Sequence, residues 1–280
     1  MKKIKFLSFL FLSIFITSCS SDSDSGDSST SNSLTVNGST VSITSATALR
    51  VENSLAIVAY ASDGSSMDLS FDKYGNLGEV RYFDADFNSK ETFQHFKSNY
   101  FTFNLISINE SQKKVKVSFS GNLYEEKNDL NSASISVNGS FDLPYIEQSP
   151  IVSGLGLTCK IAGTNWYNTE FWDNGWWSVD RKFISDDEYM IIMKFSDEAI
   201  QPGNYSFSTS SDNRIQLAKY DTETNTYIEY NTVGSLTISS NSEFSPLISI
   251  VEGTFSFTAT NPSNPSDQIQ VTNGSFKTNF

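Results

Sequence analysis

The stretch GTFSFTAT at residues 253–260, followed by a turn and then by QIQVTNGSF at residues 268–276, decides the fold of this chain. Apolar and polar residues alternate in both segments, which is the period of a half-buried β-strand. The Pro- and Asn-containing turn between them predicts an antiparallel hairpin. A weaker copy lies upstream, with GNLYE at residues 121–125 and SISVNGSF at residues 134–141. Two copies of one closing hairpin predict two copies of one domain.

The register of the second copy contains an irregularity. Ile269 and Val271 are out of step with Phe276, whereas the apolar residues of the upstream copy share a single parity. Successive side chains of a strand point to opposite faces, so one additional residue would return Phe276 to the core face. We therefore predict a β-bulge around residues 272–274.

Length and composition favour two domains of one class. A chain of 280 residues accommodates two units of about 110–130 residues, each large enough for its own core. Phe and Tyr are abundant and helix-forming residues dominate no long window, which favours strands joined by turns. Prolines and glycines cluster at residues 142–156 and interrupt regular structure. We expect an all-β fold with two tandem antiparallel domains, at residues 34–148 and 149–280, each a β-sandwich or a β-barrel.

The amino terminus has the pattern of a secretory signal. Basic residues at positions 2, 3 and 5 precede an apolar run at residues 6–16, and ITSC follows at residues 16–19. The run is too short for a membrane span and predicts a signal peptide at residues 1–18. ITSC resembles a bacterial lipoprotein box, which implies a diacylglycerol on Cys19 and cleavage in front of it. Two or more acyl chains give stable membrane anchoring. An ordinary secretory signal is the alternative.

Residues 19–33 comprise Cys19 and the Ser- and Asp-rich tract that follows it. It contains nothing that could build a core, so we expect a disordered tether. The tract resembles the export signals of surface lipoproteins in Bacteroidota. That resemblance implies an outer-membrane protein exposed at the cell surface, while a spacer facing the periplasm remains open.

Charge and cysteine content restrict the partners and the chemistry. The formal net charge is −13, and such a field repels the phosphate backbone, so we expect no nucleic-acid partner. Cys159 alternates with Leu157 and Ile161, which predicts a small buried side chain and no internal disulfide. His95 is the one histidine, and we expect it to be exposed.

No constellation for catalysis or metal binding is recognisable. The sequence has no nucleophile elbow, Walker loop, dinucleotide fingerprint or zinc-binding set. Asp84, Asp86 and Asn88 resemble the start of a calcium loop, but Ser89 and His95 stand where Gly and Glu are needed. A helix of at most two turns, capped by Ser89, is expected within residues 84–97. We predict no catalytic residue, no metal and no cofactor; a hydrolase with paired carboxylates is the least favoured alternative.

All four tryptophans lie in WYNTEFWDNGWW at residues 166–177. Trp166 occupies a position like that of Val41 and is expected in the core. The DNG sequence fits a three-residue hairpin tip, with Trp172 facing Trp176. Flat indoles beside polar groups suit sugar rings. The predicted ligand-binding residues are Tyr167, Trp172, Asp173, Trp176 and Trp177; the alternative is that these side chains cover an interface between the two halves.

Four motifs of the second half resemble a group of Bacteroidota lipoprotein domains of unknown function. They are GTNW at residues 163–166, PGNY at 202–205, GTFSF at 253–257 and TNGSF at 272–276. The first half keeps only the two ends of this pattern. The resemblance implies an extracytoplasmic all-β fold and no particular activity. We predict a non-enzymatic envelope lipoprotein that binds a glycan or a protein; a structural or envelope-assembly component is the alternative.

Overall fold

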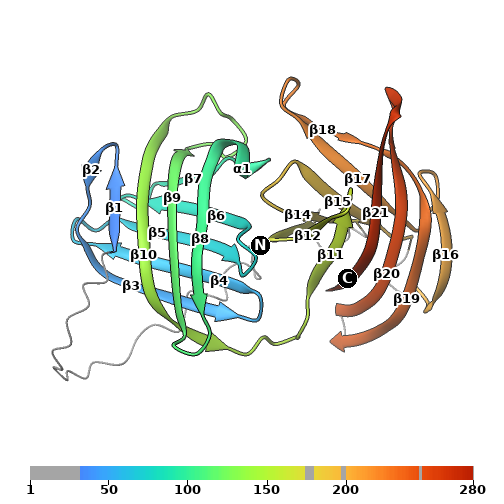
Figure 1. Cartoon of the computed structure of the whole chain (residues 1–280), viewed down its shortest axis with the longest axis horizontal. Helices are drawn as coiled ribbons and strands as arrows, with labels where there is room; N and C mark the ends of the chain where they lie inside the picture. The colour runs from blue at the N-terminus through green and yellow to red at the C-terminus, as the bar shows by residue number, and fades with distance from the viewer. Residues whose placement is uncertain (1–31, 174–179, 197–199, 246–247, 280) are drawn as a thin grey trace, which may run out of the picture.

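The computed structural model describes residues 32–173, 180–196, 200–245 and 248–279. Figure 1 shows two β-rich halves side by side, joined by the chain that runs from β10 to β11. Within these ranges the one α-helix is α1 (Lys97–Tyr100), a single turn, and no helix is long and apolar enough to cross a membrane. The expected all-β fold is confirmed.

The first half is built from one ten-stranded sheet. The pairings follow a ring, β10–β3–β4–β5–β6–β7–β9 and back to β10, so the sheet closes on itself in the manner of a barrel. All strand pairs of the ring are antiparallel except β10–β3, which is parallel. The strands are β1 (Ser33–Val36), β2 (Ser39–Thr40), β3 (Ile43–Val51), β4 (Ser54–Ala61), β5 (Ser66–Asp72), β6 (Leu77–Phe83), β7 (Ser89–Glu91), β8 (Phe101–Asn109), β9 (Lys114–Tyr124) and β10 (Ser134–Gln148).

The second half is a two-sheet sandwich. One sheet has six strands in the order β12-β11-β21-β20-β19-β16 and the other five in the order β13-β14-β15-β17-β18. Buried residues of both sheets form one core cluster, for example Leu217 with Phe255. The strands are β11 (Gly156–Ile161), β12 (Thr164–Tyr167), β13 (Glu170–Asp173), β14 (Asp180–Ile184), β15 (Tyr189–Lys194), β16 (Gly203–Ser208), β17 (Arg214–Asp221), β18 (Thr226–Glu229), β19 (Asn231–Ser245), β20 (Ile248–Asn261) and β21 (Asn264–Asn279).

The two halves open and close with the same arrangement of strands. Each opens with a tight hairpin, β1–β2 or β11–β12, whose first strand pairs with the last strand of its half, β10 or β21. The hairpin turns carry two left-handed residues each, Asn37-Gly38 at φ 49° and 77° and Ala162-Gly163 at φ 49° and 85°. Two successive positive φ angles define a type I′ turn, whose twist suits a two-residue hairpin.

The β-bulge predicted around residues 272–274 is confirmed. Gly274 lies opposite Phe255, but Val271 lies opposite Phe257, so β21 has one residue more than β20 between these pairs. The bulge returns Phe276 to the interior, where it is buried in the core cluster. A Cβ on Gly274 would lie 2.4 Å from the Phe255 ring, so glycine is required for this close approach.

The expectation for residues 84–97 was wrong. Ser89 begins strand β7 rather than capping a helix, and α1 starts only at Lys97, after Phe96 in a left-handed conformation. Asp84 Oδ1 accepts the backbone N–H groups of Asp86 and Asn88, both at 2.9 Å. This local hydrogen bonding closes a turn and competes with helix formation.

The five-stranded sheet is buried on both faces. One face contributes to the sandwich core. The other face carries a second cluster of buried side chains, Ile184, Met190, Ile192 and Ala218. The half-buried Trp172 and Tyr227 pack against this cluster. Tyr227 also packs with Phe93 of the first half. Burial on both faces explains why β15 reads as the nearly continuous apolar run YMIIMK.

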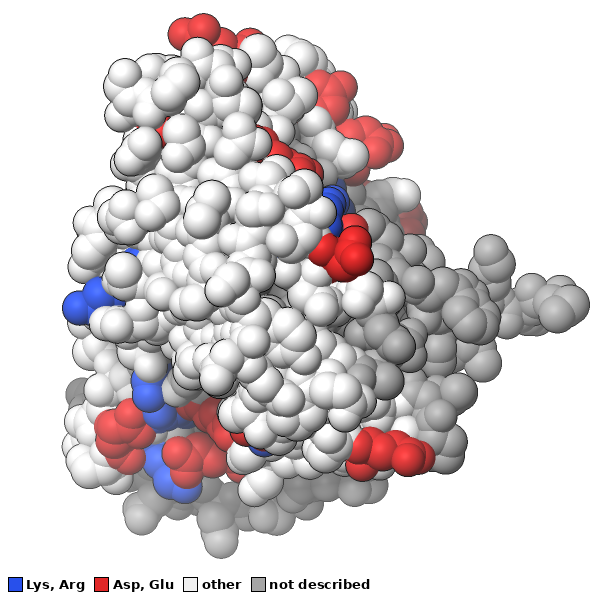
Figure 2. Space-filling view, turned by 90° about the vertical axis from the view of Figure 1, so that its right-hand side faces the viewer, with Lys and Arg blue, Asp and Glu red and all other residues white. Residues whose placement is uncertain are grey.

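The six-stranded sheet has a different outer face. In Figure 2, which looks onto the side of the molecule formed by β16, β19 and β20, the centre of the surface carries no charged residue. Acidic and basic side chains lie toward the margins of this view. In the middle of these strands the outward positions are mostly serine and threonine, as in the exposed Ser235, Thr254 and Ser256, whereas Glu243 and Glu252 lie nearer one end.

Candidate functional site

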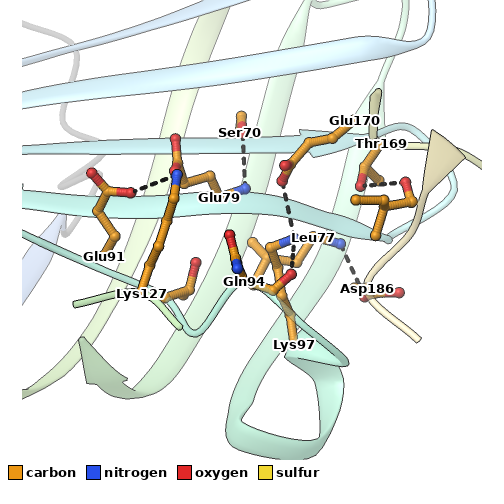
Figure 3. A network of polar contacts seen from close by, with 12 residues as sticks. Ser70, Leu77, Glu79, Glu91, Gln94, Lys97, Lys127, Thr169, Glu170 and Asp186 are labelled. Atoms are coloured by element: carbon orange, nitrogen blue, oxygen red, sulfur yellow. Dashed lines mark hydrogen bonds and ion pairs between the residues drawn. The ribbon is translucent and has the colours of Figure 1, made fainter. Parts of the chain in front are cut away.

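The predicted ligand-binding aromatics lie at the contact between the two halves, which we call the joint. The joint brings residues 74–100 and 124–130 of the first half against residues 167–172, Asp186 and residues 220–227 of the second. At its centre, the backbone carbonyl of Asp186 accepts the Ser98 N–H at 2.8 Å and the Ser98 hydroxyl at 3.0 Å. Asp186 Oδ2 accepts the Leu77 N–H at 3.0 Å (Figure 3).

A buried ion pair crosses the joint. Lys97 Nζ lies 3.0 Å from Glu170 Oε1, and the exposed fractions of the two side chains are 2% and 28%. The single turn α1 begins at Lys97, and the Gln94 carbonyl accepts a hydrogen bond from Nζ at 3.3 Å. Figure 3 shows Glu170 reaching from the second half toward this ammonium. A cation so completely removed from water needs its counter-ion to stay charged.

Acidic residues of the first half extend this network. Arg81 bridges two carboxylates, Glu79 at 2.6 Å and Glu91 at 3.2 Å, and Lys127 lies 3.4 Å from Glu91. Burial raises the pKa of Glu79 to about 7, against the opposing effect of Arg81, and the nearby Glu91 and Glu170 raise it further. Glu79 therefore holds or releases its proton near neutral pH.

A second carboxyl group with a perturbed pKa lies behind the joint. Asp187 accepts hydrogen bonds from the Trp166 indole N–H and the Tyr189 backbone N–H, each at 3.0 Å. Burial raises the pKa of Asp187 to about 7 in spite of these donors, with Asp186 and Glu188 adding to the effect. Such a pKa is suited to general acid–base chemistry, but this side chain is already occupied in holding Trp166 and the start of β15.

Aromatic rings seal the joint. Tyr74 of the first half and Tyr167 of the second are stacked, with centroids 3.7 Å apart and planes inclined by 9°. The His95 ring packs against Trp172, Tyr220 and Tyr227 of the second half, at 5.9, 5.3 and 5.3 Å between centroids. These are contacts across the joint, so the two halves share an aromatic interface.

The expectation that His95 is exposed was wrong. Its ring is half-buried among aromatic side chains of both halves, and burial, with a smaller effect from Lys97, lowers its pKa to about 4. Nothing in the local sequence indicates this, because the rings that enclose it come from β13, β17 and β18, far along the chain.

The structure separates the predicted aromatic residues. Trp166 lies in the core, as expected, and is 3% exposed. Tyr167 and Trp172 lie at the joint rather than on a free tip. Trp172 is paired across the hairpin with Lys182, and Asp173 with Arg181, so the three-residue tip with Trp172 opposite Trp176 was wrong. The DNG sequence has the composition of a tip, but β14 takes up its pairing from Asp180 onward.

Several expectations fall outside the described residues. Trp176, Trp177, the Asp173 side chain and Cys19 belong to this group. Cys159 is described and is free and buried, as predicted. Burial and the nearby Asp187 raise the pKa of its thiol to about 12, so it is protonated and unreactive in the folded protein.

Sequence reasoning missed the polar half of the joint. Lys97, Glu170 and Asp186 carry no recognisable motif, and each is one charged residue among many. The available signal was indirect: the run YMIIMK in β15 has too few polar residues for a sheet with one solvated face. That pattern indicates a second burial surface, but it does not identify the partner.

Residues 185–278 match a family model described as Domain of unknown function (DUF6252). The match covers β15 to β21 and includes the PGNY, GTFSF and TNGSF motifs. It begins after Trp166, Trp172 and Glu170, so the tryptophan-rich hairpin lies outside it. No curated protein and no solved structure matches the chain.

Proposed function

We propose that the protein is a non-enzymatic lipoprotein of the cell envelope that binds an envelope glycan or protein. The lipoprotein-like ITSC sequence would place a lipid on Cys19, and the Ser/Asp tract would serve as a tether at the outer membrane. Two β-halves that contact each other through a buried joint would then act as one binding unit. The acidic net charge of −13 argues against a nucleic-acid partner.

The observation that carries this proposal is that the two carboxyl groups with raised pKa values at the joint already bind other groups of the protein. Glu79 and Asp187 have the raised pKa values expected of catalytic carboxyls. However, Glu79 is ion-paired with Arg81, and Asp187 accepts hydrogen bonds from Trp166 and the β15 backbone. Carboxyl groups that are ion-paired or hydrogen-bonded within the fold are poorly placed to exchange protons with a substrate. This favours a binding or structural role of the protein over hydrolysis.

A second candidate function, that of a structural or assembly component without a small ligand, is favoured by the aromatic residues. Tyr167 stacks on Tyr74 and Trp172 packs beside His95, so two of the five predicted ligand-binding residues serve the joint. This observation leaves Trp176 and Trp177 as the aromatic candidates for a ligand.

Anchoring can be tested by metabolic labelling of a bacterial expression host with an alkyne fatty acid. We expect label on the full-length chain, loss of label in Cys19→Ala, and accumulation of precursor when lipoprotein signal peptidase is inhibited. Protease treatment of intact cells then distinguishes a surface from a periplasmic location. A full-length chain that is exported and cleaved without label would contradict the lipoprotein proposal.

Binding can be tested with a glycan array and with Trp176→Ala/Trp177→Ala. Loss of binding in this double variant would assign the ligand to the tryptophan-rich hairpin. Unchanged binding would direct attention to another surface. Turnover of a polysaccharide by the wild-type chain that is abolished in Asp187→Asn would contradict the non-enzymatic proposal.

A further inference from the structure

The six-stranded sheet of the second half presents an outer face whose centre carries no charged side chain, and no core cluster of the described chain covers it. Lys160 of β11 lies at the border of this face, opposite Thr272. We call this outer face the hydroxyl face. Its outward side chains, taken from four adjacent strands, are Asn204, Ser206 and Ser208 of β16, Val233, Ser235 and Thr237 of β19, Thr254, Ser256 and Thr258 of β20, and Gln270 and Ser275 of β21.

The side chains of the hydroxyl face form rows across the strands. One row runs Asn204–Thr237–Thr254–Ser275 by direct strand pairing, and a second runs Ser208–Val233–Thr258–Gln270. Neighbouring strands lie about 4.8 Å apart, so the first row offers a hydroxyl or an amide group on every strand, and the second row does so on every strand except at Val233. The side chains are short, and the surface they make is therefore flat.

Hydrogen bonds hold these rows in place. Thr237 Oγ1 donates to Asn204 Oδ1 at 2.8 Å, and Thr258 Oγ1 donates to Gln270 Oε1 at 3.2 Å. Side chains fixed in this way lose less rotamer freedom when a ligand binds, so the face is organised in advance.

The face ends in a hollow of about 440 Å³. It forms beyond the end of β16 at Ser208. The neighbouring strands β19 and β20 extend further in this direction, as far as the pair Asn231 and Thr260. Seven of the eight residues that line it carry a hydroxyl or an amide group, and the eighth is Val233: Ser208, Thr209, Ser210, Asn231, Thr232, Val233, Thr258 and Thr260.

The residues that line the hollow differ in accessibility. Val233 is 68% exposed and supplies an apolar contact among polar neighbours. Thr232, the preceding residue, is paired with the core residue Ala259 and is completely buried, so its side chain faces the interior of the sandwich. The volume of the hollow lies within the range of small-ligand sites.

The charges surrounding the face restrict the partner further. At the end remote from the hollow, Glu252 and Lys277 form an ion pair at 2.9 Å and neutralise each other. The acidic side chains that are visible in Figure 2 lie toward the margins of that face. In a protein with a net charge of −13, an anionic polymer would be repelled and a cationic one would be drawn to those margins. A neutral ligand is the one for which the uncharged centre is the preferred surface.

We propose that the hydroxyl face, with the hollow at its end, binds a neutral polysaccharide chain. Serine, threonine, asparagine and glutamine side chains can donate to and accept from sugar hydroxyls, and Val233 can contact the apolar face of a ring. The open, flat shape suits several consecutive sugar units rather than one enclosed monosaccharide. This inference rests on the proposed function and deepens it, because it assigns the glycan to a different surface from the tryptophan-rich hairpin.

The test is affinity electrophoresis of the full mature chain, made soluble by Cys19→Ser, in gels that contain a neutral or an acidic polysaccharide. Amylopectin, laminarin, galactomannan and dextran serve as neutral probes, and alginate and pectate as acidic ones. We expect retardation by at least one neutral probe and none by the acidic probes. Retardation by acidic probes alone, or by none of the six, would overturn the proposal.

Variants place the binding on the face. Ser235→Glu introduces a carboxylate at the centre and Val233→Asp introduces one beside the hollow, and we expect each to weaken retardation at least tenfold. Ser136→Glu adds the same charge to an exposed strand position of the first half and should have no effect. Ser235→Ala tests the mildest change, and circular dichroism and melting curves establish that each variant is folded.

The outcomes separate this inference from the proposed function. If a neutral probe binds but binding is lost in Trp176→Ala/Trp177→Ala and kept in both Ser235→Glu and Val233→Asp, the glycan-binding function stands and the hydroxyl face is excluded. If binding is lost equally in Ser136→Glu, the effect is one of total charge, and the assignment to this face is wrong.

Discussion

Removing the charge of Glu170 should destabilise the protein far more than removing an exposed charge. Glu170→Gln keeps the shape of the side chain and an oxygen to accept the Trp172 indole hydrogen bond, but it leaves Lys97 without a counter-ion. Lys97 is 2% exposed, and its remaining partner is the Gln94 carbonyl at 3.3 Å. Breaking a buried ion pair by removing one partner costs about 3–5 kcal/mol, and because Glu170 is partly exposed we expect the lower part of that range, roughly 3 kcal/mol.

Urea unfolding followed by tryptophan fluorescence measures this change, since all four tryptophans lie in the second half. The matched control is Glu147→Gln, which removes a carboxylate paired with Lys113 at 2.8 Å, where both side chains are about half exposed. Exposed pairs of this kind contribute little to stability. In thermal unfolding, 3 kcal/mol corresponds to a decrease in Tm of about 6–12 °C for a chain of this size.

A double-mutant cycle refines the test. Lys97→Met combined with Glu170→Gln removes both charges, so the double variant should be more stable than the sum of the two single effects predicts. If Glu170→Gln and Glu147→Gln lowered the free energy of unfolding by the same amount, then the joint would not enclose a charge, and the reasoning from its burial would be refuted.

Three further predictions concern single groups. Burial raises the pKa of Asp187 to about 7 in the folded protein, above the ordinary 3.8 of an unfolded chain. The stability that protonated Asp187 contributes is therefore fully present below pH 4 and is lost as the pH rises to 7. The free energy of unfolding should therefore fall less between pH 4 and pH 7 in Asp187→Asn than in the wild type, and an identical pH profile would contradict this. Tyr74→Ala, which removes the stack on Tyr167, should cost about 1 kcal/mol beyond the loss seen in Tyr60→Ala, a comparably exposed tyrosine; equal melting curves would argue against the stack. Cys159 should not react with a thiol reagent in the native protein and should react at once in urea; rapid native labelling would show that its site opens.

The parts of the structure that depend on local periodicity could be predicted from the sequence. The parity of Ile269, Val271 and Phe276 was sufficient to place the bulge, because alternation along one strand fixes which residues face the core. The alternation around Cys159 and the position of Trp166 likewise predicted burial. These inferences need only neighbours within one strand or one hairpin.

The joint could not be predicted, because its contacts join residues distant in the sequence. The pairing of Lys97 with Glu170 is one choice among the many charged pairs available to this chain. The His95 environment depends on rings from three strands of the second half. The error at Trp172 had a different origin. A DNG sequence favours a short turn, but the register of β13 with β14 pairs Trp172 with Lys182. Tertiary context therefore overrode the local preference.

The five-stranded sheet with two buried faces has a consequence for how this protein can be divided. A second half produced alone would lose the cover that Phe93 and His95 of the first half give to Trp172, Tyr220 and Tyr227. These rings would form an exposed apolar patch of the kind that leads to aggregation. The linker between β10 and β11 separates the two halves in the sequence, but we expect truncation there to give a poorly soluble second half. It also means that neither half can vary freely during evolution, since a substitution on one side of the joint must remain compatible with the surface that covers it.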